Sequence, residues 1–270
     1  MAEINFNSIT LDKIEVFMLH RFNHFFTVLL ILIGLSLLIF MTNADLGLVR
    51  LVALPNHQWP GMTQQPWPIL YKLAPIPGLI LGVVALTVFV AGYLFSFLKG
   101  YRREALFVVL LLALGPGLVV NVILKNHLGR PRPQELIEFG GHYQFVQSWQ
   151  RGTTGKNSSF PSGHASIAFF LIAPWFFLHR KRPGPARLFL FTGILFGLLV
   201  GIGRIEQGAH FPSDILWAGG LVYLTGEILS CFFRFDICRQ EQDSTNPVWK
   251  NSCRREGQLQ ISRSEMAGDL

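Results

Sequence analysis

Residues 105–124 read ALFVVLLLALGPGLVVNVIL and contain no charged side chain. Crossing the hydrocarbon core of a bilayer takes roughly 20 mainly apolar residues in a helix, so we expect this stretch to span a membrane. Five other stretches have similar character, although the fourth and fifth spans in chain order are short and need bilayer thinning or support from neighbouring helices. The six predicted spans are Phe25–Met41, Pro77–Leu98, Ala105–Leu124, His164–Leu178, Leu188–Gly203 and Ile215–Phe233.

The composition of the whole chain agrees with a membrane protein. Of 270 residues, 50% are hydrophobic and only 14% are charged, whereas soluble globular domains carry about 25% charged residues. So apolar a chain is not intrinsically disordered over most of its length, and its composition does not fit a collagen, coiled-coil or disulfide-scaffold class. The three cysteines, Cys231, Cys238 and Cys253, have neither metal-binding nor disulfide-framework spacing. We therefore expect an all-α integral membrane protein, a six-transmembrane helix bundle with a long extracytoplasmic loop between helices 3 and 4.

The distribution of basic residues predicts the orientation. If both termini are cytoplasmic, 15 of the 23 Lys and Arg residues fall on inner segments, as the positive-inside rule requires. The chain then divides into an interfacial N-terminal segment (1–24), a six-span domain (25–233) and a polar cytoplasmic tail (234–270). Five basic residues between positions 125 and 156 oppose the rule. Either the orientation is inverted or those charges are kept outside for a purpose.

Three polar clusters lie at the ends of predicted spans. Residues 125–133 read KNHLGRPRP and follow the third span, and residues 158–164 read SSFPSGH and precede the fourth. Residues 203–214 read GRIEQGAHFPSD and join the fifth span to the sixth. In a six-span chain these three positions are on the same face of the membrane, so a single site can be built from all of them.

The side chains in these clusters suit a phosphate group. Lys125, Arg132 and Arg204 are cations, and an Arg fork matches phosphate oxygens while Lys supplies a point charge. Ser162 and Gly163 open the fourth predicted helix, whose N-terminal N–H groups attract anions, and a glycine there lets a ligand approach the backbone.

Two imidazoles and one carboxylate complete the set. Asp214 follows His210 by four residues, a spacing at which a carboxylate can hold an imidazole in one tautomer. A neutral imidazole held in this way can attack phosphorus, and a second, protonated imidazole at His164 can give a proton to the leaving oxygen. His210 and Asp214 could alternatively be metal ligands, although no third ligand accompanies them.

Together, Lys125-x6-Arg132-Pro133, Pro161-Ser162-Gly163-His164 and Arg204-x5-His210-x3-Asp214 resemble the three-part signature of the type-2 phosphatidic acid phosphatases, which share their site with vanadium haloperoxidases. The resemblance implies that His210 is the nucleophile, that Asp214 orients it and that His164 is the general acid. The residues that it implies for phosphoryl binding are Lys125, Arg132, Ser162, Gly163 and Arg204. It implies no metal and no cofactor. The third motif departs from the family pattern, because Gly203 stands where the family usually has serine, and Arg130-Pro131 duplicates Arg132-Pro133.

The function implied by this resemblance is that of a metal-independent lipid phosphate phosphatase with a phosphohistidine intermediate. Candidate substrates are lipid A 1-phosphate, undecaprenyl diphosphate, phosphatidylglycerol phosphate and phosphatidic acid. Lipid A is preferred because the Phe139-Gly140-Gly141 element and residues 157–164 resemble bacterial lipid A 1-phosphatases. Such a protein would lie in a bacterial inner membrane with its site facing the periplasm. We expect a lipid phosphate and membrane lipids as partners, and no nucleic acid. A lipid phosphotransferase and a non-enzymatic phospholipid transporter or binder are the alternatives, and the sequence leaves the oligomeric state open.

Two further features carry weaker expectations. Glu227 lies inside the sixth predicted span, where an acidic residue marks a function or pairs with a structural partner. Residues 139–145, FGGHYQF, belong to a long segment between spans 3 and 4, and long segments of this kind are often functional. We hypothesise that they cap the site and help to select the substrate.

Overall fold

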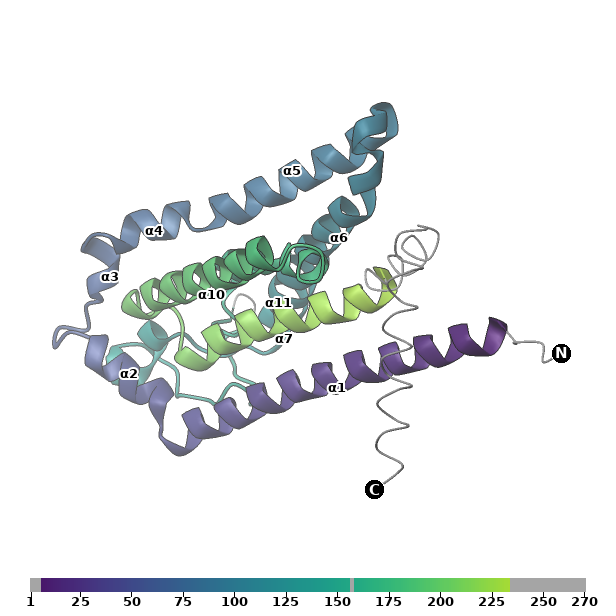
Figure 1. The fold of residues 1–270 in the computed structure, drawn as a ribbon. Coiled ribbons are helices and arrows are strands. Elements are labelled where there is room, and N and C mark those ends of the chain that lie inside the picture. The colour runs from purple at the N-terminus through teal and green to yellow at the C-terminus, as the bar shows by residue number, and fades with distance from the viewer. Residues whose placement is uncertain (1–5, 156–157, 234–270) are drawn as a thin grey trace, which may run out of the picture. The chain divides into compact units, whose positions relative to one another are not determined.

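The computed structural model describes residues 6–155 and 158–233, and Figure 1 shows that they are helical with irregular connections. No β-strand occurs in these ranges, where pairing of the β type is limited to an isolated bridge between Leu136 and Tyr143. The all-α prediction is therefore confirmed for the described residues. The predicted tail, 234–270, lies outside them.

The helices follow one another with short connections. The first half of the chain holds α1 (Phe6–Met41), α2 (Ala44–Val52), α3 (Pro60–Thr63), α4 (Trp67–Leu73), α5 (Pro75–Leu94), η1 (Ser96–Tyr101), α6 (Arg102–Leu112), η2 (Ala113–Leu124) and α7 (Lys125–His127). The second half holds η3 (Pro133–Glu135), η4 (Ile137–Phe139), α8 (Gly163–Phe169), η5 (Phe170–Ile172), α9 (Trp175–Leu178), α10 (Pro183–Glu206) and α11 (Pro212–Phe233).

Five helical stretches of the described chain are long and apolar enough to cross a membrane: Arg21–Met41, Trp67–Leu94, Ser96–His127, Pro183–Glu206 and Pro212–Phe233. They contain most of five predicted spans. The fourth predicted span lies within Gly163–Leu178, a shorter apolar stretch in which α8, η5 and α9 follow one another. The chain thus has several potential membrane helices, and the count of six stays a prediction.

Several predicted boundaries differ from the structure for local reasons. The second span was expected to reach Leu98, but α5 ends at Leu94 because Phe95 is extended (φ −114°, ψ 119°). The fifth span was expected to be short, yet α10 has 24 residues and begins with a proline at its first position, which suits a helix start. The helix of the third span widens to π-helical turns over η2, which contains Pro116, a residue without a backbone N–H.

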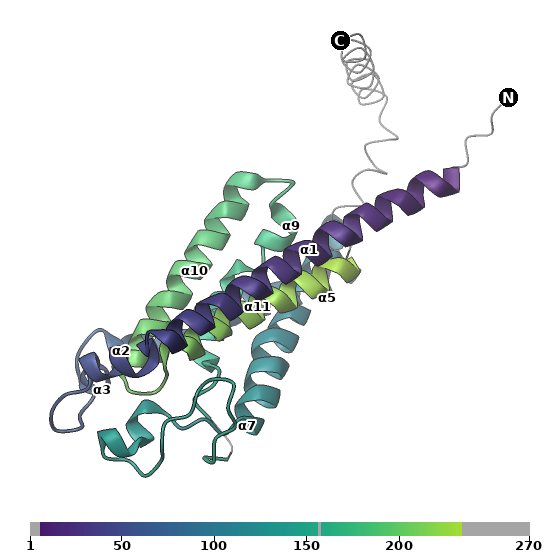
Figure 2. The same cartoon turned by 90° about the horizontal axis from the view of Figure 1, so that it is seen from below.

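Helix α1 runs along α11 in the opposite direction, as Figures 1 and 2 both show. Three pairs of contacts are spaced along the two helices: Arg21 with Glu227, Leu32 with Gly220, and Ser36 with Trp217. Because α1 is continuous from Phe6 to Met41, no break separates the predicted interfacial segment 1–24 from the first span. The interfacial position of that segment stays a prediction.

Helix α8 is buried among its neighbours. It packs against α10, α5 and η2, and α10 has glycines at positions 193 and 197 where it faces η5 and α8. A side chain at Gly193 or Gly197 would collide with Ile172 or Phe169 respectively. Small residues of this kind allow membrane helices to approach closely. This close packing holds α8 and η5 against α10, and the second polar cluster lies at the other end of α8.

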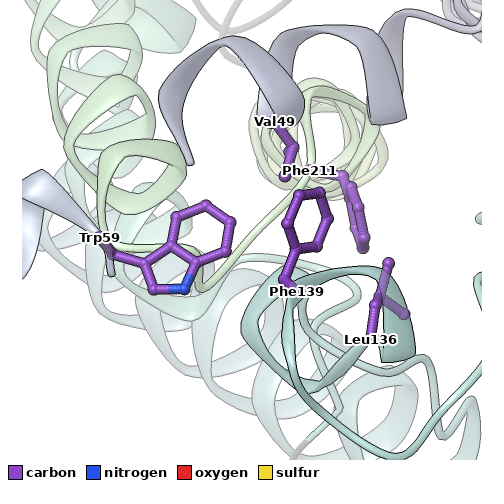
Figure 3. Packing of buried hydrophobic residues seen from close by; sticks show 5 residues of the cluster. All are labelled: Val49, Trp59, Leu136, Phe139 and Phe211. Carbon is purple, nitrogen blue, oxygen red and sulfur yellow. The ribbon is translucent and has the colours of Figure 1, made fainter. Parts of the chain in front are cut away.

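A small hydrophobic core lies beside the ends of α10 and α11. Figure 3 shows its five buried side chains, which come from α2, the residue before α3, the η3–η4 segment and the residue before α11: Val49, Trp59, Leu136, Phe139 and Phe211. This cluster, which we call the outer core, is buried on all sides, with no member more than 7% exposed. It anchors the loop that carries His210, since Phe211 is the next residue.

Candidate active site

The first and second polar clusters are joined by backbone hydrogen bonds. The N–H of Ser158 donates to the carbonyl of Lys125 at 3.0 Å, and the N–H of Ser159 donates to the carbonyl of Arg130 at 2.8 Å. The segment after η2 and the segment before α8 therefore lie in register beside each other, although about thirty residues of chain separate them.

The third cluster is joined to the other two in the same way. The N–H of Gln134 donates to the carbonyl of Gly208 at 3.0 Å, and the N–H of Ser162 donates to the carbonyl of Asp214 at 3.3 Å. The structure thus brings all three clusters to one end of the helices, as the parity of the predicted spans required.

Three cations from the first and third clusters act on the space around the two imidazoles. Lys125 is at the start of α7, Arg132 directly precedes η3, and Arg204 is near the end of α10. The charges of all three interact with the His164 imidazole, and the charges of Lys125 and Arg204 interact with His210. Such a concentration of positive charge beside two imidazoles is an environment for an anion with several oxygens.

Helix α8 starts where the sequence predicts, and Gly163 at its first position has a packing role besides the predicted one of admitting a ligand to the backbone. Ser162 is the N-cap, is fully buried and accepts a hydrogen bond from the N–H of Ala165 at 3.4 Å. A side chain at Gly163 would collide with the side-chain amide of Asn121. Gly163 is therefore needed for the close approach of η2 to α8, in addition to any backbone N–H that it offers to a ligand.

His210 and Asp214 form a buried pair at the start of α11. The Nδ1 atom of His210 lies 3.5 Å from Oδ2 of Asp214, and the same oxygen accepts the N–H of Phe211 at 2.8 Å. Burial lowers the pKa of the His210 imidazole to about 4, and the nearby Asp214 carboxylate only partly offsets this effect. At neutral pH the imidazole is uncharged, which is the form that can act as a nucleophile.

Tyr71, on α4, was not singled out from the sequence. Its ring packs on the His164 imidazole with the ring centroids 4.6 Å apart, and the guanidinium of Arg204 lies over the same ring at 4.6 Å from its centroid. Tyr71 therefore holds both a candidate acid and a candidate phosphate ligand in place. No local pattern marks it, because α4 is more than fifty residues away in sequence from every polar cluster.

The unusual glycine of the third motif also has a packing explanation in α4. A Cβ atom at Gly203 would lie 3.0 Å from the ring of Trp67 and 3.3 Å from the side chain of Leu70. Gln207 hydrogen-bonds to Arg204 and donates to the carbonyl of Trp67 at 3.4 Å. The serine that the family pattern leads one to expect at 203 would crowd α4, which is the helix that carries Tyr71.

The duplicated Arg-Pro pair has two different environments. Arg132 is partly buried and its charge interacts with Lys125 and His164. Arg130 is completely buried and donates from Nη1 to Oδ1 of Asp214 at 2.5 Å. Arg130 thus supports the carboxylate side of the site, a role that its spacing from Lys125 did not indicate.

Residues 139–145, which we hypothesised to cap the site, are partly packed into or against the outer core. Phe139 is in the outer core against Trp59, with ring centroids 5.4 Å apart, and Phe145 packs edge-on against Phe211. The exposed residues of the segment are Gly140, His142 and Gln144. The hypothesis of substrate selection therefore stays open only for the exposed residues between the two aromatics.

The alternative of a metal site requires a third ligand beside His210 and Asp214. Within residues 6–155 and 158–233, no group of three His, Cys, Asp or Glu side chains could hold a metal ion. The Asp214 carboxylate is instead occupied by Arg130 and by the N–H of Phe211.

Part of the chain is similar to known proteins. Residues 104–236 match the model of the PAP2 superfamily. The chain is 35% identical over 146 residues to a lipid A 4′-phosphatase of Francisella tularensis subsp. novicida, and 30% identical over 124 residues to an undecaprenyl-diphosphatase of Bacillus subtilis. A crystal structure of a PAP2-type phosphatidylglycerolphosphate phosphatase from Bacillus subtilis aligns with a TM-score of 0.49 at 20% identity, over 77% of this chain and 94% of that one.

These matches are centred on the part of the chain that carries the site. The two curated relatives align over 53% and 46% of this chain, and this chain spans 64% and 54% of their respective lengths. The region matched by the family model contains all three polar clusters, with both imidazoles and the five candidate phosphate ligands. Residues 104–236 are therefore similar to the PAP2 superfamily in the region that holds the candidate site.

Proposed function

We propose that this protein is a membrane lipid phosphatase that removes a phosphate group through a phosphohistidine on His210. The observation that carries the proposal is that Lys125, Arg132 and Arg204 surround the His164 imidazole, while the second imidazole, His210, is buried, uncharged at neutral pH and beside a carboxylate. Cations bind the phosphoryl oxygens, and the imidazoles carry out the chemistry.

In the first step, Nε2 of His210 attacks phosphorus, because Nδ1 faces Asp214. The new P–N bond forms as the P–O bond to the lipid breaks. Three cations surround His164, so its imidazole takes up a proton only when the negatively charged phosphate group is bound, and it then gives this proton to the departing lipid oxygen. The three cations and the N–H groups at the start of α8 stabilise the negative charge on the equatorial oxygens. The Asp214 carboxylate stabilises the imidazolium character that develops on His210.

In the second step, a water molecule attacks the phosphohistidine. His164, now without its proton, takes one from the water as the new P–O bond forms and the P–N bond breaks. Inorganic phosphate leaves and His210 returns to its uncharged form. Because the same group serves as acid and then as base, the packing of Tyr71 on His164 keeps one imidazole in position for both steps.

An amphiphilic substrate suits the position of the site, which adjoins the ends of helices apolar enough to lie in a membrane. The relative at 35% identity is named a lipid A 4′-phosphatase, which favours a lipid A phosphate and the 4′ position over the 1 position that we expected from the sequence. Undecaprenyl diphosphate is the second candidate, supported by the relative at 30% identity. A bacterial inner membrane, with the site facing the periplasm, is the proposed location.

The test is phosphate release from a panel of lipid phosphates by the purified protein in detergent. The panel contains lipid A with phosphate at the 1 position only, lipid A with phosphate at the 4′ position only, undecaprenyl diphosphate, phosphatidylglycerol phosphate and phosphatidic acid. We expect turnover of at least one member, and a loss of roughly 10³-fold or more in His210→Ala, because the nucleophile is removed. An alkaline quench with ³²P-labelled substrate should trap labelled wild-type protein and no labelled His210→Ala. Absence of release from the whole panel would contradict the proposal.

The alternatives give different products in the same assay. A phosphotransferase would move the label to an added second lipid instead of to free phosphate. A lipid transporter or binder would retain the substrate unchanged in both wild type and His210→Ala. Turnover that persists in EDTA and is inhibited by vanadate, a phosphate analogue that can occupy the phosphoryl position, is expected for the proposed reaction. Loss with EDTA and recovery with Mg²⁺ would contradict the metal-independent mechanism.

A further inference from the structure

Asp45 is a buried acidic residue that lies outside the region matched by the PAP2 model and has no role in the reaction described above. It is on α2, in the first turn, and is only 3% exposed. Oδ2 of Asp45 accepts from Nη2 of Arg130 at 2.8 Å and from the Ser213 hydroxyl at 2.6 Å, and Oδ1 accepts from the N–H of Ser213 at 2.9 Å. A buried carboxylate with so many donors has been positioned by the fold.

The partners of Asp45 are also the supports of Asp214. Arg130 donates from Nη1 to Oδ1 of Asp214 at 2.5 Å and to the Ser213 hydroxyl at 2.8 Å. One guanidinium therefore bridges two carboxylates, and Ser213, the residue before Asp214, contacts both Asp45 and Arg130. Together, Asp45, Arg130, Ser213 and Asp214 form a closed group of hydrogen bonds at the start of α11, which we call the carboxylate clamp.

The clamp is shielded from the phosphate space. The Arg130 side chain is 1% exposed, and its guanidinium lies over the ring of Phe211 at 4.3 Å and near the ring of Phe145 at 5.4 Å. Its Nε donates to the carbonyl of Val146 at 3.0 Å, so its position is fixed from several sides. Arg130 therefore cannot swing out to bind substrate, and its charge acts only inside the clamp.

The arrangement has an electrostatic consequence for His210. A guanidinium paired with Asp214 alone would neutralise much of the carboxylate charge that stabilises the His210 imidazolium in the transition state. The second carboxylate at Asp45 shares the guanidinium, so the clamp has one net negative charge, and the negative charge on Asp214 remains effective at His210.

We propose that Asp45 is a positioning residue of the active site, which acts through Arg130 and Ser213 on Asp214 and so on His210. This inference rests on the proposed function. It extends the site to a helix that precedes the family-matched region, so that the first hundred residues contribute to catalysis as well as to membrane anchoring.

The main test is Asp45→Asn, which keeps the shape of the side chain and removes its charge. Because the phosphate-binding cations are untouched, we expect kcat to fall roughly 10- to 100-fold, with KM within about 3-fold of wild type. The rate of phosphohistidine formation, measured by rapid alkaline quench, should fall by the same factor as kcat. Arg50→Gln is the matched control, since Arg50 is on the same helix and its exposed ion pair with Glu138 also ties α2 to the η4 segment. It should leave kcat unchanged.

A double variant separates action through Asp214 from a general structural effect. If Asp45 acts through Asp214, the double variant Asp45→Asn/Asp214→Asn should lose no more activity than Asp214→Asn alone. Independent, multiplicative losses would overturn the inference, as would an Asp45→Asn protein with wild-type kcat, or equal losses in Asp45→Asn and Arg50→Gln.

Folding of each variant is checked by size-exclusion elution and thermal unfolding in detergent. If Asp45→Asn does not fold, Ser213→Ala takes its place, because it removes the hydroxyl that bridges Asp45 and Arg130 without changing any charge. We then expect a smaller fall in kcat, again with KM unchanged, and wild-type kcat would overturn the inference. A wild-type protein without activity on the lipid panel would overturn the proposed function and this inference together. An active wild type, together with a clamp variant that keeps the wild-type kcat, would overturn only the inference.

Discussion

His210 is the residue whose protonation state matters most for the proposed reaction. Its imidazole is 1% exposed, and this burial makes the charged form costly, whereas the Asp214 carboxylate favours that form. Burial has the larger effect, because the pKa is lowered from 6.5 to about 4. In the proposed reaction His210 can therefore attack at neutral pH without a separate base to remove a proton.

The pH dependence of activity should reflect this. Protonation of His210 occupies the lone pair that attacks phosphorus, so kcat/KM should fall as the pH drops through the pKa. With a pKa of about 4, we expect full nucleophile activity down to about pH 5, and an acid limb below it. The measurement is kcat/KM between pH 3.5 and pH 8 in one detergent.

The substrate also titrates in this range, so its phosphate group must be followed separately by ³¹P NMR in the same detergent. After kcat/KM is corrected for the ionisation of the substrate, an acid limb centred near pH 6.5 would show that the His210 imidazole is not buried as described.

At the scale of elements, the segment that starts with η3 and η4 and continues to Phe145 contains both buried and exposed side chains. Phe139 anchors the segment in the outer core, while His142 and Gln144 lie on the surface between the two buried aromatics. An effect on stability and an effect on substrate choice should therefore come from different residues of the same short segment.

Two substitutions separate these effects. Phe139→Ala should destabilise the protein by about 3–5 kcal/mol, because it leaves a cavity beside Trp59 and Phe211. The double variant His142→Ala/Gln144→Ala should keep the wild-type unfolding temperature and change the ratio of activities across the lipid panel. An unchanged ratio in the double variant would remove the idea that this segment selects the substrate.

The contact between α1 and α11 contains a charged pair far along both helices from the site. Arg21 donates to Glu227 at 2.8 Å, with side chains that are 8% and 3% exposed, and His24 lies 3.5 Å from the same carboxylate. The intramembrane acid singled out in the sequence is thus paired. A buried ion pair of this kind contributes little to folding stability when it is intact, but removing one partner is destabilising because it leaves an uncompensated buried charge.

A matched set of variants tests this pairing. Glu227→Leu should lower stability by about 3–5 kcal/mol, and Arg21→Leu/Glu227→Leu should recover most of the loss because neither charge remains. The measurement is thermal unfolding in detergent, with activity per folded protein unchanged in both variants. A double variant less stable than the single one would indicate that Glu227 is not held mainly by Arg21.

For the whole molecule, the distribution of basic residues predicts which membrane face carries the site. The clusters gather at one end of the helices, and the positive-inside rule assigns that end to the outside. The basic residues that oppose the rule include Lys125 and Arg132, which belong to the candidate phosphate site, and Arg130, which belongs to the clamp. The proposed chemistry would therefore explain why these basic residues lie outside, if the predicted orientation is correct.

Cysteine labelling in intact cells measures this orientation. In a protein with Cys231, Cys238 and Cys253 replaced by serine, the exposed positions Gln150 and Gly100 mark opposite sides. A membrane-impermeant maleimide should label Gln150→Cys from outside, and Gly100→Cys only after the cells are permeabilised. The reverse pattern would place the site in the cytoplasm.

The sequence determined the parts of this protein that depend on local patterns. Apolar runs long enough for a bilayer predicted the helices, and the three polar clusters predicted which residues would meet, since span parity alone sets them on one face. Boundaries were less accurate, because the extended Phe95 that ends α5 and the added turns of α10 depend on packing and backbone geometry that hydropathy does not register.

Only the tertiary structure decided which groups support the site. Asp45 and Tyr71 reach the polar clusters across long stretches of chain, and no spacing rule connects residues whose contact depends on how helices pack. The same holds for two glycines. In the sequence, Gly163 is a residue of the second motif and Gly203 is a departure from the third. In the structure, Asn121 occupies the space beside Gly163 and Trp67 the space beside Gly203. Sequence patterns report the chemistry that a chain carries, whereas the environment that tunes this chemistry arises from contacts made only in the folded molecule.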